Sequence, residues 1–427
     1  MQPALDSDYP ASWYTATARG LVAPEPLQES LHADVCVIGG GYTGLSAALH
    51  LRRQGAEVVL LEARRAGWGA SGRNGGQIGS GQRREESELE HLVGQQAARE
   101  LWQLAEDAKT LVRELVARYR IACDLAEGQL IVAAKPQHAL ELARRAERLA
   151  AVYGYERMRF LDRGELRQRL ATDAYHGGIL DRGAMHLHPL NYALGLARAC
   201  REAGVRLCEG SPALGYTRSR PARVETPQGE VRADELVLAC NGYLQRLEPR
   251  LAGYIMPLNN FIVATEPLAD PAALIAGNVC VHDTRFVVNY FRLSPDGRLL
   301  FGGGENYRRR FPRDIAAFVR PVMLEIFPQL ARSRIDYAWG GTLAITLNRL
   351  PQLGRLEPNL WYAQGFSGHG VSIGTLAGQL LAEAIAGRRQ RFDRLATLPA
   401  RRFPGGTLLR WPGMVAGMLY YALRDRL

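Results

Sequence analysis

The chain has 427 residues, 47% of them hydrophobic and 22% charged, a composition typical of a soluble globular protein with more than one domain. Its net charge of +10 comes almost entirely from arginine, because Lys109 and Lys135 are the only lysines. The arginines are spread along the chain, which favours a generally basic surface and argues against a nucleic-acid partner.

The six cysteines, at positions 36, 123, 200, 208, 240 and 280, show no C-x-x-C spacing, and several lie in apolar patterns. We therefore expect reduced, buried thiols in a cytoplasmic protein, with no metal site. Residues 1–10 contain neither a basic stretch nor an apolar run, so no signal peptide is expected.

The first predicted unit is a strand, a glycine turn, a helix and a second strand. An apolar strand at 35–38 is followed by Gly39, Gly41 and Gly44 in a G-x-G-x-x-G pattern, and the second strand ends at Glu62. Such a turn brings backbone N–H groups and a helix N-terminus against a pyrophosphate. A carboxylate about 20 residues further on accepts hydrogen bonds from the adenosine ribose. The pattern predicts a bound adenine dinucleotide.

A glycine-dense loop follows this unit and reads Gly69-Ala70-Ser71-Gly72-Arg73-Asn74-Gly75-Gly76-Gln77. Its small residues and N–H groups suit close approach to a large planar ligand. The loop resembles the second flavin motif of the D-amino-acid oxidase and sarcosine oxidase group of FAD enzymes, and most closely that of the gamma-glutamylputrescine oxidoreductases. The resemblance covers nearly the whole chain, including Phe403-Pro404-Gly405-Gly406, and implies FAD as the cofactor.

The chain then leaves the dinucleotide fold and later returns to it. The elements predicted for this excursion are a helix over 95–119, a strand over 128–134 and helices over 137–153 and 163–170. The return begins with a helix that starts at Pro189 and stops at Gly204, and continues with strands over 205–208 and 235–240.

A second excursion, over 257–334, contains three predicted antiparallel strands. They cover 260–266, 286–292 and 298–304, and the hairpin signal Pro295-Asp296-Gly297 joins the last two. In the family that the chain resembles, such a sheet covers the flavin and bears the substrate pocket. Tyr290 and Arg292 have the same parity and face one side, while Glu305 and Asn306 follow a glycine run at a strand end. We expect all four to meet the substrate, with Tyr290 and Glu305 as candidate catalytic residues.

The last return contains a second glycine turn, Gly365-Phe366-Ser367-Gly368-His369-Gly370, between a strand over 360–363 and a helix that ends before Gly387. Its glycines allow the backbone to approach the flavin edge, and the helix N-terminus favours the anionic pyrimidine side of reduced flavin. His369 is therefore a candidate for flavin or substrate contact and for catalysis. Arg349, upstream of this turn, joins Arg292 as a candidate substrate-binding cation.

The resemblance carries a set of expected FAD contacts onto this sequence. They are Gly39, Gly41, Tyr42, Thr43, Gly44, Glu62, Ala63, Gly69, Ala70, Ser71, Arg73, Asn74, Gly75, Gly76, Gln77, Ala213, Asn241, Gly242, Gly365, Phe366, Ser367, Gly368, His369 and Gly370. Relatives that bind FAD covalently use a cysteine shortly before the last turn or a histidine in the glycine loop. This chain has no cysteine beyond Cys280 and no histidine within 67–77, so we expect noncovalent FAD.

The expected fold is α/β: a glutathione-reductase-like FAD-binding Rossmann domain with a second, antiparallel-sheet substrate domain (α+β). The first is assigned to residues 30–85, 180–245 and 335–400, the second to 86–179 and 246–334, and an apolar C-terminal tail to 401–427. The apolar stretch 411–423 is too short to span a bilayer. Whether it meets a membrane surface, a partner or its own fold stays open.

The expected reaction is oxidative deamination of a primary amine by hydride transfer to FAD, giving an aldehyde, ammonia and, with oxygen as acceptor, hydrogen peroxide. The resemblance implies gamma-glutamylputrescine or a polyamine as substrate. Arg292 or Arg349 would pair with a glutamyl carboxylate, whereas Glu305 would hold a distal ammonium. The alternative is an amino-acid or N-methyl-amino-acid oxidase or dehydrogenase. An RNA-modifying flavoprotein and a nonenzymatic, membrane-associated flavin-binding module are less favoured.

The sequence also bears on which electron acceptor reoxidises the flavin. The sarcosine-oxidising relatives activate oxygen with a lysine on the strand that here runs into Glu305, and this chain has no lysine there. A cation near the reacting flavin carbon stabilises developing superoxide. Unless His369 or an arginine substitutes for the lysine, we therefore expect reoxidation by oxygen to be slower than in those relatives, with a quinone or dye as a competing acceptor.

Overall fold

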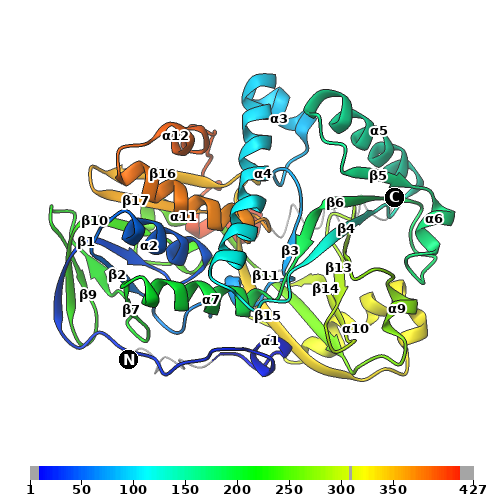
Figure 1. Ribbon diagram of the computed structural model, residues 1–427, viewed down its shortest axis with the longest axis horizontal. Helices are drawn as coiled ribbons and strands as arrows, with labels where there is room; N and C mark the ends of the chain where they lie inside the picture. The colour runs from blue at the N-terminus through cyan, green and yellow to red at the C-terminus, as the bar shows by residue number, and fades with distance from the viewer. Residues whose placement is uncertain (1–8, 307–309, 414–427) are drawn as a thin grey trace.

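The computed structural model describes residues 9–306 and 310–413, except for the side chains of Glu305 and Asn306. The described chain forms two sheets, called A and B, each covered by helices (Figure 1). Sheet A is mostly parallel and sheet B mostly antiparallel. The predicted fold class, an α/β dinucleotide-binding fold with a second antiparallel sheet, is confirmed.

Sheet A contains the first predicted strand–helix–strand unit. Its strands lie in the order β16 (Gln352–Glu357), β17 (Leu360–Gln364), β10 (Glu230–Leu238), β1 (Ser30–Ile38), β2 (Val58–Leu61) and β7 (Arg206–Cys208). From β17 to β7 the neighbours run parallel, so the carboxyl ends of these strands meet at one edge. Two short strands, β9 (Ala222–Glu225) and β8 (Gly215–Tyr216), pair antiparallel beside β10. All four residues of β2 are buried, as expected for a parallel strand covered on both faces.

Sheet B lies beside this edge. Its strands lie in the order β15 (Ile335–Ile345), β11 (Met256–Thr265), β14 (Leu299–Asn306), β13 (Tyr290–Leu293), β12 (Cys280–Asp283), β4 (Ala126–Val132), β6 (Gly178–His186) and β3 (Gln77–Ile78). A ninth strand, β5 (Met158–Leu161), pairs with β6. Neighbouring strands are antiparallel except β12 and β4, which run parallel.

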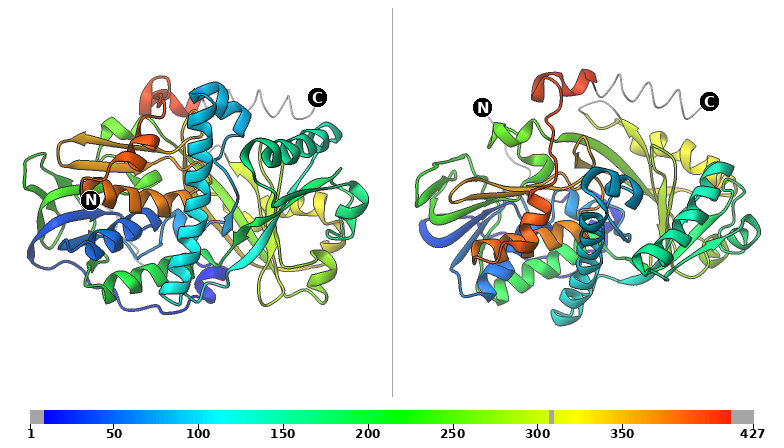
Figure 2. Two further views of the ribbon diagram at one scale, coloured as in Figure 1. Left: turned by 45° about the horizontal axis from the view of Figure 1, so that its top comes forward. Right: turned by 90° about the horizontal axis from the view of Figure 1, so that it is seen from above.

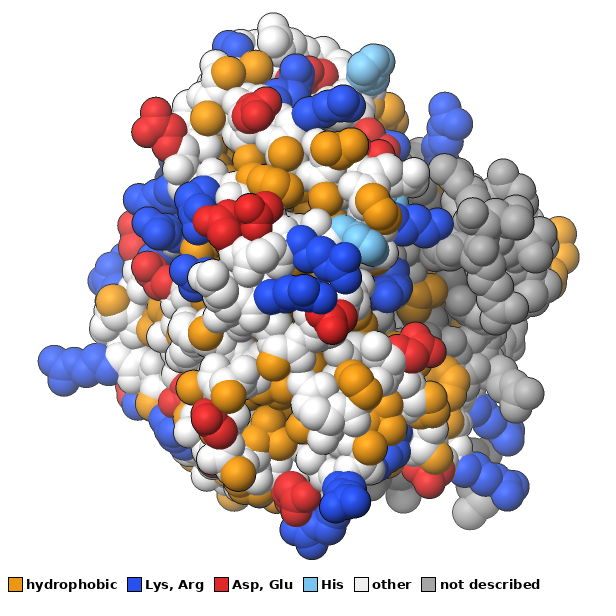
Figure 3. All heavy atoms as spheres, turned by 90° about the vertical axis from the view of Figure 1, so that its right-hand side faces the viewer, with side chains coloured by type: hydrophobic (Ala, Val, Ile, Leu, Met, Phe, Trp, Pro, Cys, Tyr) orange, Lys and Arg blue, Asp and Glu red, His pale blue; other side chains and the backbone are white. Residues whose placement is uncertain are grey.

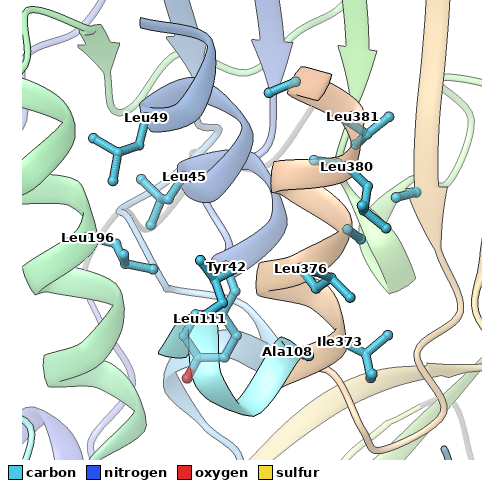
Figure 4. Close-up of a cluster of buried hydrophobic side chains, with 14 of the residues drawn as sticks. Tyr42, Leu45, Leu49, Ala108, Leu111, Leu196, Ile373, Leu376, Leu380 and Leu381 are labelled. Atoms are coloured by element: carbon cyan, nitrogen blue, oxygen red, sulfur yellow. The ribbon is translucent and has the colours of Figure 1, made fainter. Parts of the chain in front are cut away.

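Three helices from distant parts of the chain share one core beside sheet A. They are α2 (Tyr42–Arg53), α7 (Pro189–Glu202) and α11 (Ser372–Ile385), and the long helix α4 (Gln95–Arg118) crosses them (Figures 1 and 2). Figure 4 shows Leu45 of α2, Leu111 of α4, Leu196 of α7 and Leu376 of α11 in this core. Because α4 is apolar on one side, that side can pack against the three helices and exclude water from their core, while its other side faces solvent.

The remaining described helices are short or lie around sheet B. They are α1 (Trp13–Ala16), α3 (Glu86–Val93), α5 (Pro136–Tyr153), α6 (Arg163–Arg167), α8 (Pro249–Ala252), α9 (Pro271–Leu274), α10 (Ile315–Ile326) and α12 (Gln390–Ala396). Helices α3 and α5 are joined by two ion pairs, Glu86 with Arg145 and Glu90 with Arg148. These pairs hold α5 beside α3.

The surface is mixed in charge. On the face drawn in Figure 3, arginine and lysine side chains are interspersed with acidic and apolar ones and do not gather into one patch. Across residues 9–306 and 310–413, no helix combines the length and apolar character needed to cross a membrane. Most of the predicted apolar tail, residues 414–427, lies outside the described residues.

Several predicted elements differ in extent, since β10 already begins at Glu230 and β11 at Met256. The strand predicted over 286–292 is reduced to β13, because the Asp283 carboxylate accepts hydrogen bonds from the N–H groups of Arg285 and Asn289 and holds the intervening residues as a loop. The helix predicted over 163–170 stops at Arg167.

The predicted domain limits do not follow the sheets. Strand β15 was assigned to the FAD-binding part, yet it pairs along its length with β11 in sheet B. Helix α4 was assigned to the substrate part, yet most of its buried apolar side chains belong to the core of sheet A, with Trp102 in a separate cluster beside α5. Both segments cross between the two sheets, so neither periodicity nor sequence order could place the limits.

Candidate functional site

A cavity of about 1100 Å³ lies between the carboxyl edge of sheet A and sheet B. Residues at or just beyond the ends of β1, β2, β10 and β17 line one side, and residues of β4, β11, β12, β13 and β15 line the other. Small-ligand sites measure roughly 300–1000 Å³, so this cavity is large enough for a dinucleotide with a small substrate beside it.

The first glycine turn is built for close backbone contact. Gly39 has a φ of +115°, and a Cβ there would lie 2.7 Å from the Ala239 carbonyl oxygen. A Cβ on Gly44 would lie 1.8 Å from the Gly39 carbonyl oxygen. Gly41 caps α2 without any side-chain hydrogen bond, and the first turn of α2 lines the cavity. A helix N-terminus at a glycine turn provides N–H groups and partial positive charge for a phosphate.

Glu62 lies where β2 ends and lines the cavity. Its carboxylate accepts hydrogen bonds from the Gly40 N–H at 2.6 Å and the Arg64 N–H at 2.9 Å. Burial raises the pKa of the Glu62 carboxyl, and these two N–H donors oppose that rise. The side chain is therefore held rigidly at the position predicted for a ribose contact.

The glycine loop presents a buried cation. Arg73 donates through Nε to the Trp68 carbonyl oxygen at 2.7 Å and through Nη1 to the Gly340 carbonyl oxygen at 3.2 Å. Its Nη2 is buried without a hydrogen-bond partner among the described residues, and Arg73 lines the cavity. A buried donor of this kind needs an acceptor, and the phosphate or ring oxygens of FAD fit it.

The second glycine turn joins the ends of two strands. Gly365 has a φ of +75°, and its N–H donates to the Asn241 side-chain oxygen at 2.9 Å. The Ser367 N–H donates to the Ala344 carbonyl oxygen at 3.0 Å, which ties the turn to β15. Residues 366–372 line the cavity, and α11 begins at Ser372, slightly later than the glycines suggest.

The structure brings the predicted FAD contacts together. All of them line the cavity except Gly44, Gly76, Gly242 and Gly365. Gly76 and Gly365 permit close packing instead, since a Cβ would lie 2.0 Å from the Leu187 carbonyl oxygen and 2.4 Å from Thr346 Cγ2, respectively.

Tyr290 and His369, two of the candidate catalytic residues, also line the cavity. The Tyr290 hydroxyl donates to the Asn260 side-chain oxygen, and its ring packs against Gly75 and Gly302. Burial, then the nearby Arg83, lowers the pKa of His369 to about 3. Burial and Arg83 lower the pKa of His282, on β12, in the same way, to about 3. Both imidazoles are therefore neutral at physiological pH.

Arginine dominates the part of the cavity formed by sheet B. Arg83, Arg145, Arg285 and Arg349 line it, and Arg349 lies over the Phe286 ring at 5.1 Å. The acidic lining residues, within the described part of the chain, are Glu62, Glu85 and Asp283. Glu62 lies at the end of β2, and Asp283 already pairs with Arg285. The charge balance favours a ligand that carries an anionic group.

The prediction that Arg292 binds substrate is contradicted by its contacts. Its side chain is 3% exposed and is absent from the cavity lining. Nε donates to the Gly75 carbonyl oxygen at 2.9 Å, and Nη2 donates to the Leu187 carbonyl oxygen at 3.1 Å. Arg292 holds the glycine loop against the segment before α7. The side chains of Glu305 and Asn306 lie outside the described part of the structure, so both stay predictions.

Several lining residues were missed by sequence reasoning. Gln129, His282, Arg83 and Arg145 reach the cavity from β4, β12, the loop after β3 and helix α5. The available signal was a polar residue inside an apolar strand, as at Gln129 and His282. The two arginines had no such signal in a chain rich in arginine.

Comparison with known proteins agrees with this geometry. Residues 34–384 match the family model "DAO: FAD dependent oxidoreductase". The chain is 43% identical over 424 residues to gamma-glutamylputrescine oxidoreductase of Escherichia coli (strain K12), covering 99% of both proteins. It is 42% identical over 416 residues to the probable oxidoreductase OrdL of Rhizobium meliloti (strain 1021), covering 97% of each. Glycine oxidase from Geobacillus kaustophilus has a similar fold, with a TM-score of 0.75, 22% identity and coverage of 88% of this chain and 100% of that one.

Proposed function

The chain belongs to the DAO family of FAD-dependent oxidoreductases, and from that premise we propose that it oxidises the terminal primary amine of gamma-glutamylputrescine or a closely similar amine that carries a carboxylate. The family assignment confirms the predicted resemblance, and FAD is the cofactor. The enzyme acts on the C–N bond of an amine.

The choice of substrate is based on the charge of the residues that line the cavity. A free diamine or polyamine brings two or more positive charges, which the arginines along the sheet B part would repel. Gamma-glutamylputrescine adds a carboxylate, and Arg83 and Arg349 bring guanidinium groups to the cavity wall for it, whereas Arg145 already pairs with Glu86. Of these, Arg349 is the residue that the sequence also predicted to pair with the glutamyl carboxylate. Arg292, the other candidate, is no longer proposed for this contact. The identity of 43% to a gamma-glutamylputrescine oxidoreductase supports the same substrate.

Held by the two glycine turns, Glu62 and Arg73, FAD would supply the oxidant that takes up a hydride from the carbon beside the neutral amine. The resulting iminium adds water and breaks down to an aldehyde and ammonia. The chain's own part is to bind and orient the amine and to keep it neutral. The neutral imidazoles of His282 and His369 can accept an N–H hydrogen bond, and the nearby arginines disfavour a protonated amine.

The test is anaerobic bleaching of the bound flavin by a panel of gamma-glutamylputrescine, putrescine, spermidine, glycine and sarcosine. We expect gamma-glutamylputrescine to reduce the flavin with at least tenfold higher efficiency than putrescine. Preference for spermidine would overturn the choice of substrate, and preference for glycine or sarcosine would favour the amino-acid alternative. Release of aldehyde and ammonia in equal amounts checks the reaction.

A further inference from the structure

A buried side-chain amide beside the cavity has an unsatisfied oxygen. Gln129, on β4, is 2% exposed and lines the cavity. Its Oε1 is buried and accepts no hydrogen bond from any described residue. Leaving a buried acceptor unpaired costs free energy, so such an atom at a ligand cavity points to a donor on the ligand.

The orientation of this amide is set by its neighbours. Gln77 Nε2 donates to the Val281 carbonyl oxygen at 2.9 Å, so the other end of that amide must be an acceptor. Gln129 Nε2 donates to this acceptor, Gln77 Oε1, at 3.1 Å. The Gln129 side chain also forms a hydrogen bond with Cys280, opposite it in the strand register, that favours the thiolate, and the Cys280 thiol lies near the carbonyl oxygens of Gly128 and Met185. Gln129 therefore presents an oxygen, and not an NH₂ group, as its unused end.

A gap left by glycine lies in front of this oxygen. A Cβ on Gly79 would lie 3.0 Å from Gln129 Oε1 and 3.9 Å from His369 Nε2. The backbone of Gly79 is outside the left-handed region, so its conformation does not require glycine. The missing side chain leaves room for a small group that both polar atoms can reach.

Two arginines and one carboxylate lie around this gap, and one of the arginines, Arg145, is paired with Glu86. Arg83 from the loop after β3 and Arg145 from α5 affect both His282 and His369 electrostatically. Asp181, opposite Gln129 on β6, accepts hydrogen bonds from Ser80 and Tyr155 instead of facing a ligand alone. A neutral acceptor among cations binds N–H groups without favouring an extra positive charge.

We propose that Gln129 Oε1 accepts a hydrogen bond from the reacting amino group of the substrate, in the gap at Gly79, with the neutral His369 as the second contact. The proposal rests on the proposed function and adds the residue that positions the nitrogen. A carboxylate at this place would hold the ammonium form, which has no lone pair to release. The amide instead binds the neutral amine from which a hydride can leave.

The experiment compares two ligands on the FAD-loaded enzyme. One is gamma-glutamylputrescine, and the other is N-(gamma-glutamyl)butylamine, which lacks the terminal nitrogen. Gln129→Met should raise the Kd of the first about tenfold, the loss expected for one hydrogen bond to a buried acceptor, and leave the Kd of the second within twofold. For the amine, Kd comes from the concentration dependence of anaerobic flavin reduction. For the butyl compound it comes from the change in flavin absorbance.

Two further variants sharpen the result. Gln129→Glu should move the acid limb of the flavin-reduction rate about one pH unit higher, because a carboxylate stabilises the ammonium form. Gly79→Ala should weaken binding of the amine while the FAD content and spectrum stay normal, because its methyl group fills the gap. An unchanged acid limb in Gln129→Glu, or unchanged amine affinity in Gly79→Ala, would overturn the proposal.

Failure of this inference can be told apart from failure of the proposed function. An equal rise in the Kd of both ligands in Gln129→Met would show that Gln129 has a purely structural role. Unchanged Kd values for both would show that Gln129 does not contact the amine. If no amine reduces the flavin of the unaltered enzyme, the proposed function fails. The Kd values of both ligands are then taken from flavin absorbance, and amine binding that is absent or independent of Gln129 overturns the inference as well.

Discussion

Glu62 closes the first strand–helix–strand unit with a buried carboxylate whose two oxygens face backbone N–H groups. Replacement with glutamine would turn an NH₂ group toward one of these donors and would remove the charge offered to a ribose. We expect Glu62→Gln to weaken FAD binding more than tenfold, a loss of about 1.5–3 kcal/mol. The measurement is fluorescence titration of the apoprotein with FAD. Glu57→Gln, at an exposed ion pair in the same unit, is the control and should bind FAD normally.

Such a titration assumes that FAD is noncovalent, as the absence of attachment residues predicts. Heat denaturation should release all the flavin into the supernatant. Unchanged FAD affinity in Glu62→Gln would remove the ribose assignment.

The prediction about the electron acceptor also concerns single residues. The described residues that line the cavity include no lysine, and Lys109 lies behind its wall and donates to Ser80 Oγ at 2.5 Å. We expect reduced enzyme to react with oxygen more slowly than a lysine-containing oxidase measured alongside in stopped flow. His369→Ala and Lys109→Met would show whether either side chain supplies the remaining rate. Equal rates for the two unaltered enzymes would refute the prediction.

At the scale of elements, the contact of α2 with α11 brings the two glycine turns to one cavity. Gly378 on α11 makes this contact close, because a Cβ there would lie 2.4 Å from the Thr43 carbonyl oxygen and 2.6 Å from the Ala47 nitrogen. The Ser46 hydroxyl donates across the contact to the Thr375 carbonyl oxygen at 2.7 Å. The two helices can therefore approach only where a side chain is missing.

Gly378→Val should force these helices apart and destabilise both turns. We expect a loss of about 3 kcal/mol or more in the free energy of unfolding, since the obstructing atoms belong to the backbone, together with weaker FAD binding. Urea unfolding with and without FAD measures both effects. Gly215→Val is a matched control, because a Cβ there would meet nothing within 4 Å. Similar losses in the two variants would argue against a specific helix contact.

At the scale of the whole molecule, His188 joins the N-terminal segment to α7. Its Nδ1 accepts the Asn191 N–H at 3.1 Å, and its Nε2 lies 3.0 Å from Thr17 Oγ1. Burial, then the nearby Arg292, lowers the pKa of His188 to about 3. The unfolded chain has a histidine pKa of about 6.5, so between these values only the unfolded state binds the proton. The stabilising contribution is complete above pH 6.5 and is lost as the pH falls toward 3.

His188→Asn keeps a side chain that can cap α7 but removes this titration. The unfolding free energy should therefore change less between pH 7 and pH 5 than in the unaltered protein, by about 2 kcal/mol. Urea unfolding at the two pH values gives the difference. His91→Asn, at an exposed position, should leave the pH dependence as it is. An unchanged pH dependence in His188→Asn would show that another group controls acid stability.

The sequence by itself determined the two glycine turns, the strands and helices that flank them, and a bound adenine dinucleotide, which the resemblance to flavoenzymes then identified as FAD. Each of these depends on residues close together in the chain, such as Gly39 with Gly44, or Gly365 with His369. Glycine spacing and apolar periodicity report local backbone needs, so a short stretch is sufficient to read them.

Only the tertiary structure decided which side chains share the substrate part of the cavity. Strand register and helix packing bring Gln129, Arg145 and His282 together with His369 from four separate segments, and they turn Arg292 into a support for the glycine loop. Whether an arginine faces a ligand or a carbonyl oxygen depends on neighbours more than 100 residues away, as for Arg292 and Leu187. No local pattern in the sequence records such a pairing, because it arises only when distant strands of sheet B come together.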